Sequence, residues 1–337
     1  MKPKIAIVNS TSFGIKFPDH IERLKEFSEV ERINFPKDVS DFTIINELKD
    51  FDGIIAGLSP FYSRKILENL KKLKIISRHG IADSNIDMKA ATELGICVCR
   101  YPLEIQRESI AEYTVALMLL LIRKLTQAEK YTKTGWWGRR IELVGFELKG
   151  KKVGIIGMGN VGSRVAEILK NGFNAIVLGF DDYLSEEEIR KRCAEPVSFE
   201  ELIRTSDIIT LHCSLTEKTY HFLNENTFSK MKDGVIIINT AEGKMIDENA
   251  LFSALKSGKV GGFAADVVEG EPIGINSPLL KFKNVIILPH IGRYTYETIE
   301  KMGESTIKNM HDFFVKNKIP EYIENPDVIG KLKKNIT

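Results

Sequence analysis

Short apolar runs alternate with amphipathic helical stretches along most of the chain. In the first hundred residues the apolar runs are KIAIV, GIIAGL, LKIIS and GICVC, and helical patterns such as SRKILENLKKL and IDMKAATEL separate them. Runs of this length are typical of buried strands, and their alternation with helices predicts βαβ units around a mostly parallel sheet. We therefore expect an α/β fold in this part of the chain.

A second alternating series begins near residue 151. It contains KKVGIIGMG, AIVLGF, DIITLH, GVIIIN, GGFAADVV and NVIILPH, and a long amphipathic helix is predicted over 295–317. Between the two series, residues 109–134 predict one long helix whose middle is apolar on every side. Such a helix is expected to be buried, either between domains or at a subunit interface. The pattern as a whole predicts two series of βα units.

Composition limits the class of protein further. The chain has 337 residues, 43% of them hydrophobic and 28% charged, which fits a soluble globular protein with two domains. Its net charge of +2 gives no reason to expect a nucleic-acid or membrane partner. The longest apolar segment, residues 115–122, is far shorter than the roughly 20 residues of a membrane span. No secretory signal is recognised at the N-terminus, so we expect a cytoplasmic protein.

Four cysteines are scattered along the chain, at Cys97, Cys99, Cys193 and Cys213. They lack the spacing of zinc ligands, so no metal site is predicted. Cys97 and Cys99 fall on one face of an expected strand. We expect both to pack in the core, as free cysteines commonly do.

The most specific local signal is a glycine-rich turn between an expected strand and an expected helix. Gly157, Gly159 and Gly162 form G-x-G-x-x-G. The glycines permit a tight turn, a close approach to a pyrophosphate and close helix–strand packing, and the helix N-terminus offers N–H groups to the phosphates. The next strand ends at Asp181, about twenty residues on, where a carboxylate accepts hydrogen bonds from ribose hydroxyls. Asp182 adds negative charge and no Lys or Arg follows directly, so NAD is favoured over NADP. The alternative is an ordinary βαβ turn without a nucleotide.

Six further motifs, in order, resemble those of the D-isomer-specific 2-hydroxyacid dehydrogenases. They are SRHGIADSNIDMKAATELGICV, ESIAEYTVALMLLLIRK, SDIITLHCSLTEKT, MKDGVIIINTAEG, ALKSGKVGGFAADVVEGEP and NVIILPHIG. This family includes D-lactate, glycerate and phosphoglycerate dehydrogenases and glyoxylate/hydroxypyruvate reductases. The resemblance covers nearly the whole chain.

The resemblance implies an α/β protein with two doubly wound parallel-sheet domains. Residues 1–100 and 289–337 would form a flavodoxin-like substrate domain, and residues 101–288 a Rossmann domain that binds NAD. The active site would lie in the cleft between them, and a homodimer would form through the nucleotide domain. The implied activity is that of an oxidoreductase, with hydride transfer between NAD(H) and a small anionic 2-hydroxy or 2-keto acid.

Reduction of a 2-keto acid requires a proton donor and a group that polarises the carbonyl. By resemblance, His290 is the general acid, Glu271 is its carboxylate partner and Asp266 accepts from the nicotinamide amide. An imidazole can donate and recover a proton near neutral pH, and a carboxylate on its second nitrogen fixes the tautomer and raises the pKa. Without the resemblance, a histidine at a strand end is more often structural, and Asp266 could simply cap local backbone. Glu269, which is also nearby, is expected to be solvent-exposed.

The resemblance assigns further residues to the cofactor and the substrate. The additional cofactor residues are Asn160, Val161, His212, Cys213, Ser214, Thr219, Thr240, Ala241 and Gly292. For the substrate, the resemblance gives Gly80, Ile81 and Ala82, whose backbone N–H groups would receive the carboxylate. Arg78 and Arg293 are added to the substrate residues as cations that could bind it, although the family usually has a small residue at position 293. Ser214 replaces a common proline and Ala82 a glycine, and the added methyl of Ala82 would narrow the pocket or strain a turn that requires positive φ.

Glu242, in the stretch NTAEGK, departs from the family's pattern. The resemblance places there an arginine that contacts the substrate carboxylate and its carbonyl oxygen. Two like charges at about 4 Å repel by roughly 4 kcal/mol at an effective dielectric near 20. Loss of the cation also removes stabilisation of the charge that develops on the oxygen as hydride arrives. We place Glu242 with His290 and Glu271 among the catalytic-site residues.

Several explanations of Glu242 are open. In the first, another cation takes the place of the family's arginine, with Arg293 the leading candidate and Arg78 or the Arg139–Arg140 pair as others. In the second, the substrate carries a cationic or hydroxyl group that Glu242 recognises. Alternatively, the protein is a catalytically silent NAD(H)-binding sensor or interaction protein, or the residue was altered to disable an enzyme. In the simplest case Glu242 points to solvent and pairs with Lys244. The retained histidine–glutamate pair favours catalysis, because a binding module does not need it.

Overall fold

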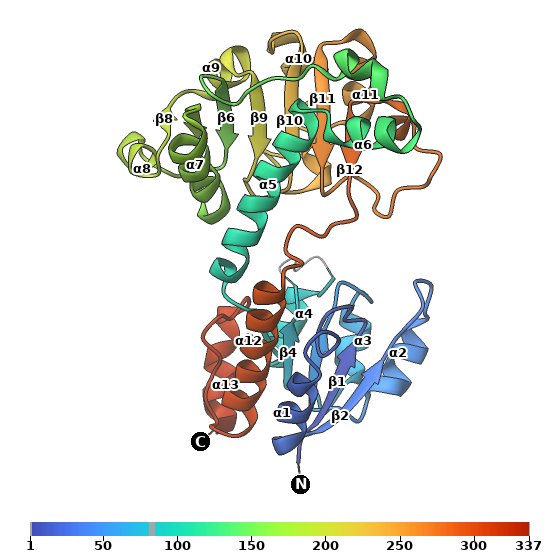
Figure 1. The fold of residues 1–337 in the computed structure, drawn as a ribbon. Helices are drawn as coiled ribbons and strands as arrows, with labels where there is room; N and C mark the ends of the chain where they lie inside the picture. The colour runs from blue at the N-terminus through green and yellow to red at the C-terminus, as the bar shows by residue number, and fades with distance from the viewer. Residues whose placement is uncertain (1, 81–84, 337) are drawn as a thin grey trace. The chain divides into compact units, whose positions relative to one another are not determined.

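The chain forms two α/β units in a computed structural model that describes residues 2–80 and 85–336 (Figure 1). Unit 1 comprises residues 1–105 and 294–337, and unit 2 comprises residues 106–293. Unit 1 is therefore assembled from both ends of the chain. Each unit has a central sheet in which every strand pair is parallel.

Unit 1 contains five strands in the order β2-β1-β3-β4-β5. Its elements are β1 (Lys4–Val8), α1 (Asp19–Phe27), β2 (Glu29–Ile33), α2 (Asp41–Leu48), β3 (Gly53–Ala56), α3 (Arg64–Asn69), β4 (Ile75–Arg78), α4 (Met88–Leu94), β5 (Cys97–Cys99), α12 (Tyr296–Phe314) and α13 (Ile329–Ile336). Along β1, Ala6 and Val8 pack in a core with α2, α3 and α4, whereas Ile5 and Ile7 pack with α1, α12 and α13. Both faces of the sheet are thus covered, which explains why its strands read as continuous apolar runs.

Unit 2 contains seven strands in the order β12-β11-β10-β9-β6-β7-β8. Its elements are α5 (Arg107–Ile122), α6 (Leu125–Lys133), β6 (Lys152–Ile156), α7 (Asn160–Phe173), β7 (Ile176–Phe180), α8 (Glu186–Lys191), β8 (Glu195–Pro196), α9 (Phe199–Thr205), β9 (Ile208–Leu211), α10 (Glu225–Lys230), β10 (Val235–Asn239), α11 (Glu248–Ser257), β11 (Val260–Ala265) and β12 (Val285–Ile287). One core lies beneath α5, α7 and α8, and the other beneath α9, α10 and α11. The strand order reverses between β6 and β9, where open parallel sheets bind ligands at their carboxyl ends.

The single helix predicted over 109–134 is wrong at its centre, because the structure has two helices there. Lys124 adopts the left-handed conformation (φ 53°), which a continuing helix does not permit. The carbonyl of Ile122 instead accepts a hydrogen bond from the Phe146 N–H at 3.0 Å. The apolar residues of α5 pack in the core of unit 2 itself.

Two other expectations concern burial and span length. Cys97 and Cys99 are fully buried in β5, so the prediction of core packing is confirmed. Within residues 2–80 and 85–336, no helix has both the length and the apolar character that crossing a bilayer requires.

Candidate active site

Three neighbouring strands bring the predicted catalytic residues to one edge of the unit 2 sheet. In the parallel register, Asn239 at the end of β10 pairs with Ala265 of β11, which pairs with Ile287 of β12. The residues that follow these strand ends therefore gather at the same edge. They include Glu242, Asp266 and His290, which the sequence separates by up to 48 positions.

His290 and Glu271 form a hydrogen-bonded pair. The imidazole Nδ1 lies 3.0 Å from Glu271 Oε2, while Glu271 Oε1 accepts the Val268 N–H at 2.8 Å. The hydrogen bond to Glu271 raises the pKa of His290 above its ordinary value, although burial opposes the shift. Burial would raise the pKa of Glu271, but the hydrogen bonds from His290 and from the Val268 N–H lower it. The pair thus favours an imidazolium beside an ionised carboxylate.

The backbone at His290 is held in an uncommon conformation. Its φ is 55°, in the left-handed region that non-glycine residues seldom adopt. Its N–H donates to the carbonyls of Asp266 (3.1 Å) and Leu288 (3.0 Å). Within the described part of the chain, no hydrogen-bond partner is found for the second ring nitrogen, Nε2. One nitrogen is therefore anchored while the other is available to exchange a proton.

Asp266 fixes the loop that carries His290. Its carboxylate is buried and accepts from the Tyr113 hydroxyl at 3.1 Å and from the N–H groups of Ile291 and Gly292 at 2.9 and 2.7 Å. This is the backbone capping that was the alternative explanation for Asp266. A carboxylate has about four acceptor positions, so one remains for a further donor. Tyr113 was missed in the sequence, since a tyrosine in an apolar helix gives no sign of a partner 153 residues away.

The loop that carries Glu242 is pinned from both sides. Asn239 accepts the Ala241 N–H at 3.0 Å through Oδ1 and donates to the Glu242 carbonyl at 2.9 Å through Nδ2. Gly243 packs so closely on the next loop that a Cβ there would lie 2.1 Å from the backbone carbon of Val268. Because the Val268 N–H is bound by Glu271, this packing fixes the Glu242 loop against the His290–Glu271 pair.

The Glu242 side chain is partly buried rather than directed freely into solvent. Burial raises its pKa, the positive charge of His290 opposes the shift, and the negative charge of Glu271 adds to it. Among the described residues, its carboxylate has no hydrogen-bond or ion-pair partner, Lys244 included. The simple explanation of a solvent-exposed Glu242 paired with Lys244 is therefore not what the structure has.

The expectation that Glu269 is solvent-exposed is wrong. Its carboxylate lies 2.8 Å from His221 Nε2, and the side chain is 31% exposed. The His221 ring stacks on Tyr220 with their centroids 4.0 Å apart. The Glu269 N–H also donates to Glu248 at 3.1 Å. Glu271, rather than Glu269, bonds the imidazole of His290.

The glycine-rich turn occupies the point where the strand order reverses. Gly157 has φ 93°, and a Cβ there would lie 2.4 Å from the Cys213 nitrogen. A Cβ at Gly162 would lie 2.0 Å from the Gly157 carbonyl oxygen, whereas Gly159, before the first turn of α7, faces open space. Only glycine satisfies the first position, and the space at Gly159 leaves the backbone accessible to a phosphate.

A cavity of about 410 Å³ extends from this turn. Its lining includes Gly157, Gly159, Phe180, Asp181, Asp182, Phe199, His212, Cys213, Ser214, Thr219 and Phe222. Asp181 accepts the N–H groups of Met158 (2.8 Å) and Tyr183 (2.9 Å), which leaves acceptor capacity for ribose hydroxyls. Burial lowers the pKa of His212 to about 3, so its ring is neutral. An apolar wall, a carboxylate and an open helix N-terminus are what the adenosine and pyrophosphate of NAD require, so these residues fit that group.

The remaining predicted residues are distributed over both units. Asn160 and Val161 open α7, and Thr240 bonds Thr114 through their hydroxyls at 2.8 Å just before Ala241. In unit 1, Arg78 is buried in β4 and donates to Asn85, and Gly80 follows that strand. Ile81 and Ala82 lie outside the described residues. Arg293 lies near enough to His290 for its charge to oppose protonation of the imidazole, whereas Arg139 pairs with Glu142 at 2.6 Å.

Comparisons with known proteins agree with this fold and site. Residues 115–292 match the sequence model of the D-isomer specific 2-hydroxyacid dehydrogenase NAD-binding domain. The chain is 34% identical to a glyoxylate reductase of Thermococcus litoralis, over 98% of each protein. It also resembles the structure of a D-lactate dehydrogenase from Aquifex aeolicus complexed with NAD and lactic acid (TM-score 0.82, 30% identity, 95% of this chain and 99% of that one). A third similar structure is an acyclic imino acid reductase in complex with NADPH and D-Arg (TM-score 0.82, 27% identity, 95% and 99% covered).

The chain therefore belongs to the D-isomer-specific 2-hydroxyacid dehydrogenase family. The resemblance drawn from the six motifs is confirmed, and so is the prediction of two parallel-sheet α/β domains. The protein is an NAD-dependent oxidoreductase of the 2-hydroxyacid dehydrogenase class.

Proposed function

We propose that His290 is the proton donor in hydride transfer between NAD(H) and the 2-keto or 2-hydroxy acid. The observation that carries this proposal is its geometry, with Nδ1 anchored by Glu271 at 3.0 Å and the backbone held by Asp266. A positioned imidazole contributes about 10²- to 10⁴-fold to proton-transfer catalysis. NAD, when bound, supplies or accepts the hydride.

The other residues of the site divide the remaining tasks. Glu271 keeps His290 protonated and fixes its tautomer, and Asp266 positions the 290–292 loop while retaining one acceptor for the nicotinamide amide. Gly157, Gly159 and the start of α7 would hold the pyrophosphate, and Asp181 the ribose. The neutral His212 with Cys213, Ser214 and Thr219 would line the cofactor, as would Thr240, Ala241 and Gly292. Arg78, Gly80 and Arg293 are proposed to contact the substrate.

Glu242 narrows the choice of substrate. A partly buried carboxylate beside His290 disfavours an anion at the reacting oxygen. One structural relative is described as an imino acid reductase, so reduction of C=N has to be considered beside reduction of C=O. The alternative is a catalytically silent NAD(H)-binding sensor or interaction protein. The partly buried carboxylate of Glu242 favours this silent alternative, because it would repel a forming alkoxide.

The first experiment is to measure NADH oxidation against a panel of 2-keto acids, after NADH binding has been verified by fluorescence. The panel runs from glyoxylate, hydroxypyruvate and pyruvate to phosphorylated, phosphonate and amino-bearing analogues. Turnover of any member at ordinary enzymatic rates supports the dehydrogenase. Binding without turnover on the whole panel supports the silent alternative.

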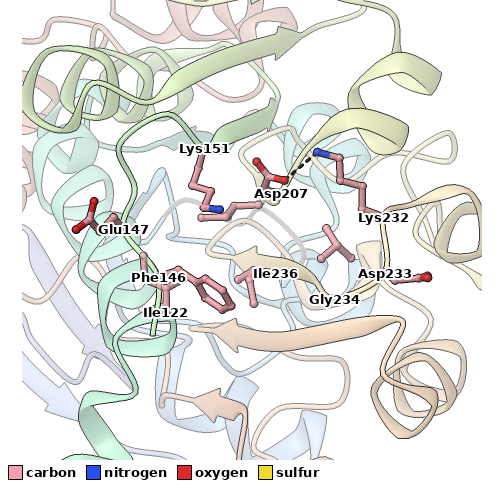
Figure 2. Close-up of a pocket in the computed structure, with 11 residues that line it drawn as sticks. Ile122, Phe146, Glu147, Lys151, Asp207, Lys232, Asp233, Gly234 and Ile236 are labelled. Carbon is pink, nitrogen blue, oxygen red and sulfur yellow. Dashed lines mark hydrogen bonds and ion pairs between the residues drawn. The ribbon is translucent and has the colours of Figure 1, made fainter. Parts of the chain in front are cut away.

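We also propose that the protein is a homodimer that associates through unit 2. Trp137, Ile141, Val144 and Phe146 form an apolar stretch after α6, and each is at least 60% exposed. Beside it lies a pocket of about 250 Å³. Figure 2 shows that Phe146 and Ile236 lie near Lys151 and the Asp207–Lys232 ion pair in this pocket. Exposed apolar patches of this kind support association. Trp137→Lys with Ile141→Asp should produce a monomer in analytical ultracentrifugation, and an unchanged sedimentation coefficient would contradict this interface.

We further propose a cytoplasmic location. All four cysteines are free thiols in the structure, two of them fully buried. Free thiols are typical of proteins in reducing compartments. Fractionation of cells that express the tagged chain would test the location.

A further inference from the structure

Two carboxylates, Glu271 and Glu242, interact with the charge of His290, and only Glu271 bonds its imidazole. Glu271 is committed to Nδ1 of His290 and to the Val268 N–H. Glu242 interacts with His290 and Glu271 through their charges, yet no donor reaches its carboxylate among the described residues. An ionised carboxylate has about four acceptor positions, and burial without donors is costly. Glu242 is therefore suited to accept a donor from a ligand.

The negative charge of Glu242 favours a protonated imine over a keto group as the reacting group of the ligand. Reduction of C=O places negative charge on oxygen, which a neighbouring carboxylate destabilises. A protonated imine carries positive charge and an N–H donor at the reacting group, and a carboxylate stabilises both. The protonated imine is also the form that accepts a hydride readily, so a residue that keeps the nitrogen protonated promotes the reaction.

Packing fixes the Glu242 loop relative to the residues that hold the His290–Glu271 pair. Asn239 bonds both sides of the Glu242 loop, and Gly243 lies against the backbone of Val268. Val268 in turn is bonded to Glu271, the partner of His290. The backbone at Val268 therefore contacts the Glu242 loop and also bonds the carboxylate partner of His290.

We propose that the substrate reduced at this site is a protonated 2-imino acid, formed from a 2-keto acid and ammonia or a primary amine, and that Glu242 recognises its C=N–H group. This inference rests on the proposed function, because it keeps the hydride transfer and the role of His290. It changes the atom that receives the electrons from oxygen to nitrogen.

The reaction balances without a further oxidant or reductant. Condensation of the keto acid with the amine, plus one proton, releases water and gives the iminium. The hydride from NADH forms a C–H bond at the iminium carbon, the electron pair of the C=N π bond moves to nitrogen, and NADH becomes NAD⁺. The neutral amine then takes a proton from His290 or from solvent. The product is an amino acid rather than a hydroxy acid.

The test compares NADH oxidation by the 337-residue chain with pyruvate or glyoxylate alone and with the same acids plus methylamine. Mass spectrometry distinguishes the N-methyl amino acid from the hydroxy acid. We expect methylamine to raise the rate at least about tenfold and the N-methyl amino acid to be the main product. Calorimetry with NAD⁺ present gives a second readout, in which N-methylalanine should bind more tightly than lactate.

Two variants and one control assign the effect to Glu242. Glu242→Gln, which removes the charge but keeps the shape, should lower the amine-dependent rate about tenfold to a hundredfold, the range of a charge-assisted hydrogen bond. Glu242→Arg should abolish the amine dependence and raise keto acid reduction. Glu187→Gln removes a charge that is 79% exposed on α8, and it should leave both rates unchanged. NADH fluorescence verifies that each variant still binds cofactor.

The possible failures are distinguishable. Keto acid reduction that methylamine does not accelerate would overturn the inference and leave the proposed dehydrogenase standing. Amine-dependent turnover that Glu242→Gln leaves intact would also overturn it, because another group would then recognise the nitrogen. NADH binding without any turnover, with or without amine, would overturn the proposed function and with it the inference.

Discussion

Two histidine–carboxylate pairs lie at the same edge of unit 2, and their acids are only two residues apart. His290 bonds Glu271 at 3.0 Å and His221 bonds Glu269 at 2.8 Å, and all four side chains are about one-third exposed. Both histidines also have positive φ, 55° and 46°. In distance, burial and backbone geometry the pairs are nearly alike.

The difference is in what surrounds each ring. The His221 ring stacks on Tyr220, and the second carboxylate whose charge acts on it, Glu248, already accepts the Glu269 N–H at 3.1 Å. The second carboxylate whose charge acts on His290 is Glu242, and within the described residues no donor reaches it. The two pairs therefore differ in the second carboxylate beside each histidine, and the length of the hydrogen bond does not distinguish them.

Removing each ring gives the largest contrast between the pairs. His290→Ala should lower the turnover number about 10²- to 10⁴-fold, since it deletes the proton donor. NADH affinity, measured by fluorescence, should change little. A loss smaller than about tenfold would contradict the assignment of His290 as general acid.

Removing the charge of Glu271 should alter the pH dependence. With the proposed role of His290, reduction by the wild type requires the protonated imidazole, so the rate should fall as the pH rises through the raised pKa of that residue. Glu271→Gln removes the main cause of the rise, so the fall should move to a lower pH. The measurement is the pH profile of kcat/KM. An unmoved profile would mean that another group sets the protonation state.

The same pair should also contribute to folding within a defined pH range. Because the pKa of His290 is raised on folding, its contribution is complete below its ordinary value of 6.5 and is lost as the pH rises through the folded-state pKa. The pKa of Glu271 is lowered, so its contribution is present above 4.5 and is lost as the pH falls through the folded-state pKa. The destabilisation by Glu271→Gln should be greatest between these values, as thermal unfolding at several pH values would test.

A substitution at Gly243 disturbs both pairs at once. Gly243→Ala places a Cβ 2.1 Å from the Val268 backbone, so the two loops have to separate. We expect the free energy of unfolding to fall by about 1–3 kcal/mol, as for other overpacked sites. Gly274→Ala, where nothing lies within 4 Å of the added Cβ, is the matched control. Equal melting temperatures for the two variants would show that the contact is not rigid.

Removing His221 should have the smallest effect. His221→Ala deletes a partly exposed hydrogen bond to Glu269, for which we expect a loss of no more than about 0.2–1 kcal/mol, the contribution of an exposed ion pair. The turnover number should stay within about fivefold of the wild type, the factor that corresponds to 1 kcal/mol even if all of that energy were lost from the transition state. Thermal unfolding and steady-state kinetics measure the two quantities. A loss comparable to that of His290→Ala would erase the distinction between the pairs.

Most of the fold could be predicted because the buried parallel strands form continuous apolar runs. The strands that gave no such run lie at sheet edges: β2 has the polar sequence EVERI, and β8 has two residues. The break between α5 and α6 was also hidden, because a lysine gives no sign that it will adopt positive φ. Local patterns therefore predict the central strands better than the edges and helix ends.

The site was predictable to the extent that it is local. The glycine turn is defined by spacing alone, and the resemblance singled out His290 and Glu271. The contacts of Tyr113 with Asp266 and of His221 with Glu269 span 153 and 48 residues, so neither could be read from a short motif. Glu242 was recognised as unusual, but its lack of a donor became visible only once the surrounding residues had been located.

The close packing of Gly243 on Val268 has a consequence for how such a site can change. Because the backbone on either side of position 242 is held by Asn239 and by the next loop, an exchange at that position alters the charge presented to a ligand while the loop stays in register. Substrate preference at this position is thus separable from folding, and the exchange of this one residue can change whether an anionic or a cationic ligand is preferred. For protein engineering, position 242 is the natural first position to randomise.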